Sequence, residues 1–306
     1  MTIIGAIDIG GTKIAAGAVT EDGTILARRE CATLPESGFS FALQRTKAML
    51  HEVSSSVGVR FDGIGVACPG PLDPFTGILD EVGTLPGWQG GNLVTEFASE
   101  FGVRVAVEND ADAAALAEAY WGAGKGSRNL IYITISTGIG GGIILGGQLY
   151  RGANGAHPEL GHQIIDASGP LCYCRAHGCW ESLASGSAIA FWVQEQEPVP
   201  VPKTAEGIAQ LAEKGDPLAL RAMDREGFYF GLGLANIITL FTPGTVVLGG
   251  GVMQSSHLFL PRALEVVHDV CTQVPVKNTL ITLAALGSVT GLAGAAQAWF
   301  CRYAHS

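Results

Sequence analysis

The stretch IIGAIDIGGTKIAAGAVTEDGTILARRE, residues 3–30, indicates the fold of this chain. It reads as an apolar strand, a glycine-rich turn, a second strand, the turn signal EDG and a third strand. A second stretch, LIYITISTGIGGGIILGGQLYRG at residues 130–152, repeats this pattern. We therefore expect two related domains that face each other across a cleft, with the two glycine-rich turns lining the cleft.

The segments outside these two stretches alternate between strand and helix patterns, which is typical of an α/β protein. The sequence thus predicts an α/β fold built from two halves. The predicted elements are strands at 62–67, 103–109, 245–251 and 280–284 and helices at 40–53, 92–101, 111–122, 204–213, 217–226, 228–240, 258–272 and 288–302.

The composition limits the possible partners. The chain has 306 residues, of which 47% are apolar and 15% charged, enough for two domains with a large core. A net charge of −10 without a Lys/Arg cluster predicts no nucleic-acid partner and no anionic membrane partner. The N-terminus lacks the pattern of a signal peptide. Pro243 interrupts the most apolar tract, which favours a buried helix followed by a buried strand over a membrane span. With seven cysteines, an odd count, we expect reduced thiols in a cytoplasm.

The first glycine-rich turn, AIDIGGTK, follows a buried strand pattern. Gly10 and Gly11 would let backbone N–H groups approach phosphate oxygens, with Thr12 and Lys13 beside them. Asp8 at the strand end is suited to a hydrated Mg²⁺ that also contacts phosphate. The turn is not a P-loop, because the Lys-Ser/Thr pair of that motif is missing. The alternative is an ordinary hairpin turn that contains an aspartate.

Two further glycine-rich segments favour a nucleotide site. ISTGIGGG at 135–142 repeats the arrangement in the second half, with Thr137 and Gly138 at the turn. VVLGGGV at 246–252 is another strand that ends in glycines, and a planar base could lie on the bare backbone of Gly249 and Gly250. Two such turns at matching positions would rarely arise by chance.

The segment ENDADAAALAE carries the residue expected to do the chemistry. A strand ends at Glu108, and Asn109 and Asp110 stand at the start of a helix. Asp110 is therefore a candidate base that accepts the proton of an attacking hydroxyl. The structural alternative is that Asp110 only caps the helix, since aspartate is a favoured N-cap residue.

The segment GHQIIDASGPLCYCRAHGCWE, residues 161–181, is rich in metal-binding side chains. His162, Cys172, Cys174 and Cys179 form a four-ligand set suited to a structural Zn²⁺. The alternative is three buried free thiols with a histidine nearby by chance.

Other polar residues stand next to this set. His177 is a rival fourth ligand and His157 a weaker one. Glu159 and Glu181 flank the set, so a metal-fixed loop would bring them together with His162 on one polyol such as a sugar. For each glutamate alone, the alternative is ordinary surface solvation.

Together these motifs resemble the ROK family (repressor, open reading frame, kinase) of the sugar kinase and actin-like ATPase superfamily. The resemblance rests on DIGGTK, ENDADAAALAE, STGIGGG, ELGH, GPLCYCRAHGCWESLASG and VVLGGGV, in family order over nearly the whole chain. It implies two actin-like, ribonuclease H-like lobes around a nucleotide and sugar cleft, with a small zinc-binding loop. We expect a first lobe at 1–117 joined by the last helix at 288–306, and a second lobe at 118–287 with the zinc loop at 157–181.

The resemblance also implies roles for single residues. Asp110 is the catalytic base, ATP and Mg²⁺ bind in the cleft, and a structural Zn²⁺ holds the loop. The implied sugar-binding residues are Gly70, Asn109, Asp110, Glu159, His162 and Glu181. The implied nucleotide-binding residues are Asp8, Gly10, Gly11, Thr12, Lys13, Thr137, Gly138, Gly249 and Gly250. The implied zinc ligands are His162, Cys172, Cys174 and Cys179.

The chain departs from the family pattern at three places. Arg175 follows the second cysteine, where the family usually has glycine, so Arg175 takes an unusual φ or the turn differs. Thr84 stands where many glucokinase-like members carry asparagine. His157-Pro158 resembles fructokinase-like members. The last two departures leave the identity of the sugar open.

The sequence therefore predicts a cytoplasmic enzyme that transfers the γ-phosphoryl of ATP to the 6-hydroxyl of a hexose, glucose first. Fructokinase and N-acetylmannosamine or N-acetylglucosamine kinase are the alternatives, and we expect a homodimer or homotetramer. The repressor branch carries an N-terminal helix-turn-helix domain, for which the residues before Asp8 leave no room. A non-catalytic sugar sensor is disfavoured because Asp8, Asp110 and both glycine-rich turns are intact.

Overall fold

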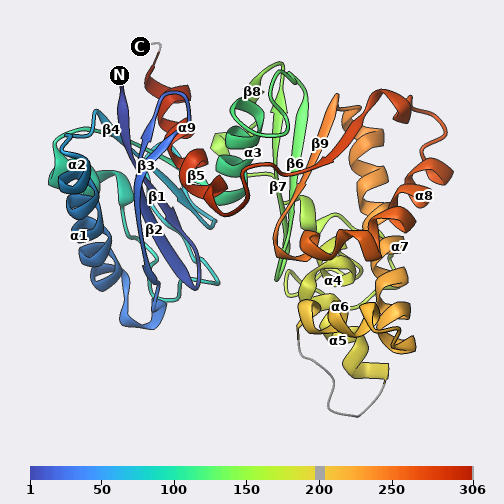
Figure 1. The fold of residues 1–306 in the computed structure, drawn as a ribbon. Coiled ribbons are helices and arrows are strands. Elements are labelled where there is room, and N and C mark those ends of the chain that lie inside the picture. Colours follow the sequence, from blue (N-terminus) through green and yellow to red (C-terminus); the bar gives the residue numbers. More distant parts are fainter. Residues whose placement is uncertain (197–203, 305–306) are drawn as a thin grey trace. The chain divides into compact units, whose positions relative to one another are not determined.

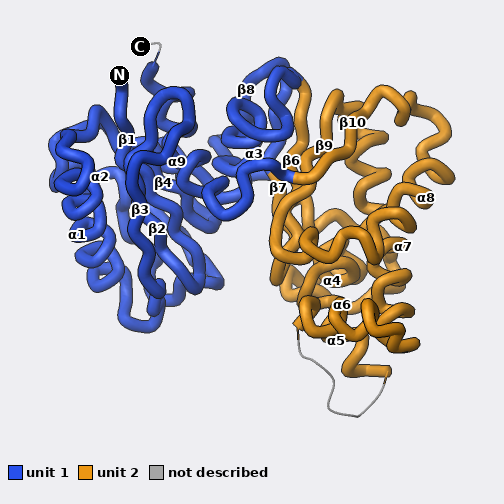
Figure 2. Tube along the Cα trace, in the orientation of Figure 1, with its two compact units in different colours: residues 1–128, 142–158, 284–306 blue, residues 129–141, 159–283 orange. Residues whose placement is uncertain are grey.

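The computed structural model describes residues 1–196 and 204–304, which form two compact units (Figure 2). The first unit comprises residues 1–128, 142–158 and 284–306, and the second comprises 129–141 and 159–283. Each unit is described by itself below. The division into lobes at 117/118 and 287/288 stays a prediction, and residues 305–306 of its last segment lie outside the described residues.

The first unit is built on a five-stranded mixed sheet (Figure 1). The strand order is β3-β2-β1-β4-β5, with β1–β2 and β2–β3 antiparallel and β1–β4 and β4–β5 parallel. The strand pattern predicted for 3–30 is confirmed. The strands are β1 (Ile3–Ile9), β2 (Lys13–Thr20), β3 (Ile25–Ala32), β4 (Gly63–Cys68) and β5 (Arg104–Asn109).

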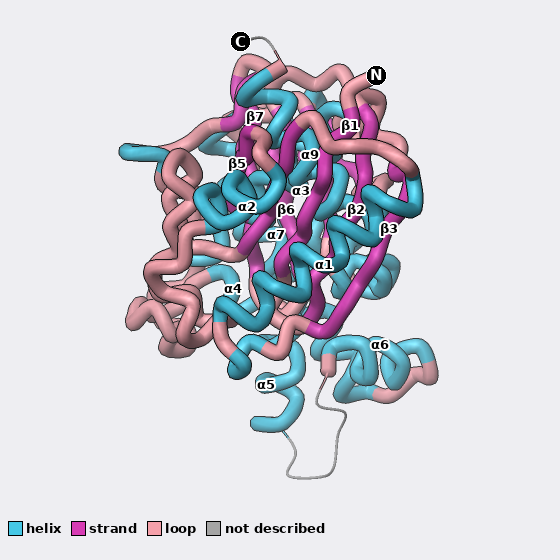
Figure 3. Tube along the Cα trace, turned by 90° about the vertical axis from the view of Figure 1, so that its left-hand side faces the viewer, coloured by secondary structure: helices cyan, strands magenta, loops and turns pink. Residues whose placement is uncertain are grey.

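Helices cover both faces of this sheet. Helices α1 (Phe39–Val57) and α2 (Leu93–Phe101) pack on one face, and α1 lies in front of β2 and β3 in Figure 3. Helix α9 (Thr290–Tyr303) packs on the other face and against α3 (Asp110–Tyr120). Side chains alternate along a strand, so Ile7 of β1 joins the core under α1, and Ala6 joins the core under α9. The same alternation places Asp8 on the α9 side of the sheet.

The second sheet has the order β10-β9-β6-β7-β8, and β9 runs parallel to both β6 and β10. Its hairpin confirms the pattern predicted for 130–152. Strand β7 begins in the second unit and ends in the first. The strands are β6 (Leu130–Ile135), β7 (Ile139–Leu145), β8 (Gln148–Leu149), β9 (Thr245–Gly249) and β10 (Leu280–Leu283).

Helix α7 (Pro217–Phe241) is continuous, so the prediction of two helices at 217–226 and 228–240 is wrong. The prediction treated Gly227 as a break. In the structure, a Cβ at Gly227 would lie 2.6 Å from the carbonyl oxygen of Phe259, so the glycine allows the segment before α8 to approach α7. The neighbouring helices are α4 (Trp180–Ala184), α5 (Gly186–Gln196), α6 (Ala205–Glu213) and α8 (Leu260–Val270). Among the described residues, no helix is long and apolar enough to span a bilayer.

Candidate active site

The turn after β1 is held in place by backbone and side-chain hydrogen bonds. The N–H of Gly10 donates to the carbonyl oxygen of Lys13 at 2.8 Å, and the hydroxyl of Thr33 donates to the carbonyl oxygen of Gly10 at 2.6 Å. Gly11 lies against Thr84, because a Cβ at Gly11 would be 3.0 Å from the Thr84 Cβ. The side chains of Thr12 and Lys13 are exposed. These hydrogen bonds thus fix the backbone of the turn, while its polar side chains remain exposed to solvent.

Asp8 lies at the end of β1, where its carboxyl group is packed closely and lies near another negative charge. Burial is the largest cause that raises the pKa of Asp8 to about 6, followed by the charge of Asp110, while Lys13 lowers it. The first turn of α9 is packed closely here, since a Cβ at Gly291 would lie 2.1 Å from Asp8 Oδ2. The carboxyl of Asp110 thus disfavours the ionisation of Asp8, and a bound cation would favour it.

Asp110 is the first residue of α3, and Asn109 is its N-cap. The Asn109 side-chain oxygen accepts the N–H groups of Ala111 and Asp112 at 2.8 and 3.2 Å. The interpretation of Asp110 as the helix cap is therefore wrong, although its carboxylate also accepts the Ala111 N–H at 2.9 Å. Asn109 Nδ2 lies 3.4 Å from the Cβ position of Gly70, so two predicted sugar-binding residues are neighbours.

Asp110 is exposed to solvent, yet many protein atoms surround its carboxyl group and reduce its solvation. Burial is the largest cause that raises the pKa of Asp110, while the hydrogen bond from the Ala111 N–H and the charge of His157 lower it. An effective general base has a pKa near the working pH, and a raised pKa brings a carboxylate closer to this value. The electrostatics at Asp110 are therefore compatible with proton abstraction.

Behind Asp110, the first unit contains buried ion pairs that sequence reasoning missed. Glu108, which is buried, pairs with Arg151 and lies 3.8 Å from Arg302. Asp112, also buried, has a carboxylate oxygen at hydrogen-bond distance from His157 Nδ1, 2.9 Å away. His157 is not in the group of described residues whose ligand atoms could hold a metal ion. The alternation of charged and apolar residues in ENDADAAA was the only signal for these pairs, and it does not specify partners.

The predicted metal ligands come together in the second unit. One ligand atom from each of His162, Cys172, Cys174 and Cys179 lies within 4.8 Å of the others. Ligands of a tetrahedral zinc with Zn–S bonds near 2.3 Å would be about 3.8 Å apart. The spacing and the three-thiol, one-imidazole donor set therefore fit a structural Zn²⁺. His177 is not part of this group, and its Nδ1 lies 3.1 Å from the carbonyl oxygen of Gly169.

The loop around the ligands takes the unusual conformation that the sequence departure suggested. Arg175 has φ of 75°, in the left-handed region where glycine is favoured. The Arg175 N–H donates to the carbonyl oxygen of Cys172 at 2.9 Å, so the residue closes a tight turn between two ligands. This conformation is strained for an L-residue such as Arg175, whereas glycine adopts it readily.

The predicted sugar-binding residues of the second unit lie around the same loop. Glu181 Oε2 accepts the N–H of Ile139 at 2.8 Å, and a Cβ at Gly138 would lie 2.3 Å from that oxygen. Glu159 is exposed and His162 is half-buried. The glycine-rich turn between β6 and β7 thus positions Glu181. Glu181 links this turn, which is predicted to bind phosphate, with the residues that are predicted to bind sugar.

A cavity of about 450 Å³ in the second unit adjoins this turn. Thr137 lines it, together with Ser187, Glu206 and Gln254, which sequence reasoning missed. Gly249 and Gly250 do not line it. Instead, a Cβ on Gly249 would lie 2.3 Å from the Tyr132 hydroxyl, and one on Gly250 would lie 2.2 Å from the Ile135 carbonyl oxygen. These glycines therefore permit close packing of β9 and the following turn on β6.

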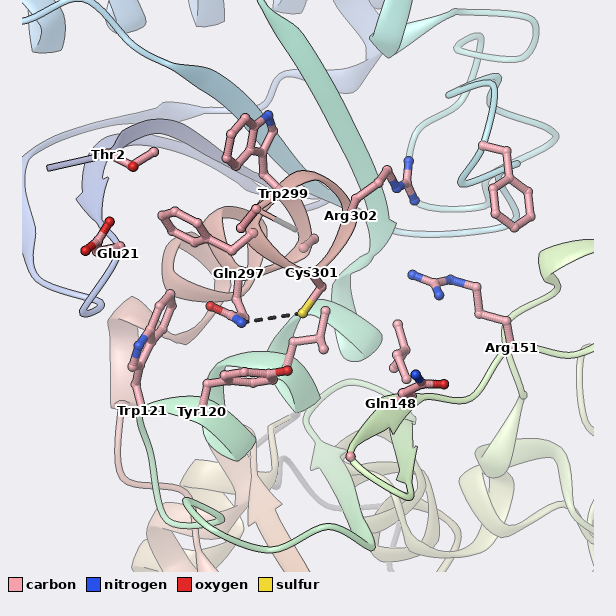
Figure 4. A pocket seen from close by; sticks show the side chains of 17 residues that line it. Thr2, Glu21, Tyr120, Trp121, Gln148, Arg151, Gln297, Trp299, Cys301 and Arg302 are labelled. Atoms are coloured by element: carbon pink, nitrogen blue, oxygen red, sulfur yellow. Dashed lines mark hydrogen bonds between the residues drawn. The ribbon is translucent and has the colours of Figure 1, made fainter. Parts of the chain in front are cut away.

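A larger cavity, of about 910 Å³, lies in the first unit beside α9 (Figure 4). Its lining includes Tyr120, Arg151, Gln297 and Cys301, and the Gln297 amide donates to the Cys301 thiol at 3.4 Å. None of the predicted site residues lines it. The cavity is therefore separate from the residues gathered above.

Comparison with known proteins identifies relatives along the whole chain. The sequence profile of the ROK family matches residues 4–301. A glucokinase of Thermotoga maritima is 32% identical over 302 residues, 95% of each chain. The crystal structure of a ROK hexokinase from Thermus thermophilus superposes with a TM-score of 0.90 at 34% identity and full coverage of both chains. The crystal structure of a ROK family glucokinase from Streptomyces griseus in complex with glucose and AMPPNP superposes with a TM-score of 0.80 at 31% identity, covering 96% of this chain and 98% of that one.

Proposed function

The chain belongs to the ROK family and is an ATP-dependent sugar kinase, and from this premise we propose that it phosphorylates a hexose at the 6-hydroxyl, with glucose preferred. The observation that best supports the chemistry is the pair of carboxyls at the end of β1 and the start of α3. Asp110 has a raised pKa and is freed from the cap by Asn109. It is therefore available to accept a proton from substrate.

In the proposed reaction, Asp110 takes the proton of the 6-hydroxyl as the oxygen attacks the γ-phosphorus of ATP. The new bond joins the sugar oxygen to phosphorus, and the bond between phosphorus and the ADP oxygen breaks. Asn109 and Gly70 in the first unit, and Glu159, His162 and Glu181 in the second, are proposed to hold the sugar hydroxyls. Backbone N–H groups of the two glycine-rich turns, with Thr12, Lys13 and Thr137, are proposed to hold phosphates.

The preferred sugar is tested with purified enzyme by coupled ADP-release assays over hexoses and N-acetylhexosamines. We expect the highest kcat/KM with glucose, and phosphorus NMR of the product should show a 6-phosphate. A higher kcat/KM with fructose, N-acetylmannosamine or N-acetylglucosamine would replace glucose by that sugar. Sugar binding without turnover on any member of the panel would instead support a sensor.

We further propose that Asp8 helps to hold Mg²⁺, which neutralises phosphate charge when it is bound with ATP. Only the ionised carboxylate binds a cation, and the pKa of Asp8 is raised to about 6. The Mg²⁺ affinity in the presence of nucleotide should therefore fall as the pH is lowered from 7 to 5, by roughly tenfold per unit below the pKa.

Titration of activity against Mg²⁺ concentration at several pH values measures this dependence. Asp8→Asn should weaken Mg²⁺ binding at pH 7 and remove most of the pH dependence. Glu52→Gln is a matched control, because Glu52 pairs with Arg29 on the exposed surface of the first unit, 3.6 Å away, and is not among the charges that shift the pKa of Asp8. An Asp8→Asn enzyme with the wild-type Mg²⁺ dependence would rule out this role.

A further inference from the structure

The hydroxyl of Tyr173 occupies a hydrogen-bonding position on the predicted sugar-binding histidine. Tyr173 lies between two of the zinc-ligand cysteines, and its hydroxyl is 2.9 Å from His162 Nε2. The two rings meet edge to face, with centroids 5.0 Å apart and an interplanar angle of 81°. The side chain is otherwise mostly in solvent, with 78% of its surface exposed. Its polar end is therefore held by contacts, although its ring is not packed into a core.

The two carboxylates predicted to bind sugar also act on this hydroxyl. Partial burial is the largest cause that raises the pKa of Tyr173, followed by the charges of Glu181 and Glu159. The phenol oxygen thus contacts His162, one of the three side chains of the second unit to which a role in sugar binding is assigned above, and the charges of the other two act on it.

The polarity of these contacts follows from the metal site. His162 Nδ1 is the nitrogen that faces the thiol of Cys172, 3.6 Å away. An imidazole that binds a metal through Nδ1 is neutral and carries its proton on Nε2, so Nε2 is a donor. With a metal ion on Nδ1, Tyr173 Oη would accept the Nε2 proton of His162. A sugar hydroxyl that accepts from the same imidazole N–H would make the same bond.

We propose that Tyr173 is a determinant of sugar affinity, because its hydroxyl occupies the hydrogen-bonding position on His162 Nε2 that a sugar hydroxyl takes in the complex. The inference rests on the proposed function, since it uses the assignment of His162 to the sugar. A sugar that enters the site must displace the phenol, and the free energy of the phenol's hydrogen bond to His162 is subtracted from the free energy of binding.

Tyr173→Phe keeps the ring and removes only the competing hydroxyl. A net hydrogen bond contributes about 1 kcal/mol, so we expect the Kd and KM for the sugar to fall by roughly three- to tenfold. The kcat should stay near the wild-type value, because the phenol is absent from the reacting complex. Isothermal calorimetry and steady-state kinetics measure the two effects separately. Zinc content and melting temperature should be unchanged.

Tyr150→Phe is the matched control, since Tyr150 is an exposed tyrosine of the first unit, outside the zinc loop. It should leave the Kd and KM unaltered. An unchanged or weaker sugar affinity in Tyr173→Phe would overturn the inference. Absence of sugar binding by the wild-type protein would overturn the proposed function, whereas equal binding by both proteins would overturn only the inference about Tyr173.

Deoxy sugars locate the competing hydroxyl. If one sugar hydroxyl replaces the phenol, the gain in affinity from Tyr173→Phe should disappear with the monodeoxyglucose that lacks that hydroxyl. The gain should persist with the other monodeoxyglucoses. The same gain with every deoxy sugar would mean that the phenol hydroxyl hinders sugar binding by its size alone. That result would contradict the proposed exchange of hydroxyls.

Discussion

Replacing Asp110 with asparagine is expected to lower kcat on the order of 10²- to 10⁴-fold while the melting temperature stays nearly constant. The amide is too weak a base to take the hydroxyl proton. Stability is preserved because the cap of α3 is provided by Asn109, whose side-chain oxygen accepts two backbone N–H groups. The amide oxygen of the variant can still accept the Ala111 N–H that Asp110 accepts at 2.9 Å.

Sugar binding should largely survive in this variant, because an amide still hydrogen-bonds a hydroxyl. The measurements are kcat, the sugar Kd by calorimetry and a thermal melting curve. Asn109→Ala is the informative control, because it removes the cap and should destabilise the protein by about 1 kcal/mol. A near-normal kcat in Asp110→Asn would refute the catalytic assignment.

The second large effect concerns the metal cluster. We propose that purified protein carries about one Zn²⁺ per chain, held by His162, Cys172, Cys174 and Cys179. Cys172→Ser or Cys174→Ser should release it and lower the melting temperature strongly, because binding of a structural zinc contributes directly to the folding free energy. Sugar affinity should also fall, since the loop that carries His162 would lose its fixed conformation.

Metal analysis by mass spectrometry and thermal melting measure these effects. Cys301→Ser is a matched control, because Cys301 is exposed like Cys174 but lies on α9 in the first unit. That variant should keep its zinc. A chelator should lower the melting temperature of the wild type far more than that of Cys174→Ser. Wild-type protein that contains no zinc, after preparation under reducing conditions without chelator, would disprove the four-ligand assignment.

Local sequence patterns were sufficient for the strands and most helices. The strand-turn-strand segments at 3–30 and 130–152 are readable because apolar alternation and glycine turns act between near neighbours in the chain. The ligand set of His162 with three cysteines was also readable, because the chemistry of the side chains and their close spacing already limit the possibilities. The family resemblance rests on these same short segments.

Other features depended on which segments meet in three dimensions. Gly227 is unfavourable for an isolated helix, yet α7 continues through it because α8 and the segment before it pack there. Asn109 and Asp110 are both good caps, and the position where β5 ends decides that Asn109 serves. His162 rather than His177 joins the cysteines because the path of the loop directs His177 to Gly169.

The sequence by itself determined the kinds of elements and the kinds of chemistry available, since propensity, periodicity and ligand type are properties of single residues and close neighbours. The tertiary structure alone decided the partners, including Tyr173 on His162 and Glu181 on the turn of β6 and β7. Such contacts join residues from separate segments of the chain. Their geometry follows from how the segments pack, to which a local sequence pattern contributes only indirectly.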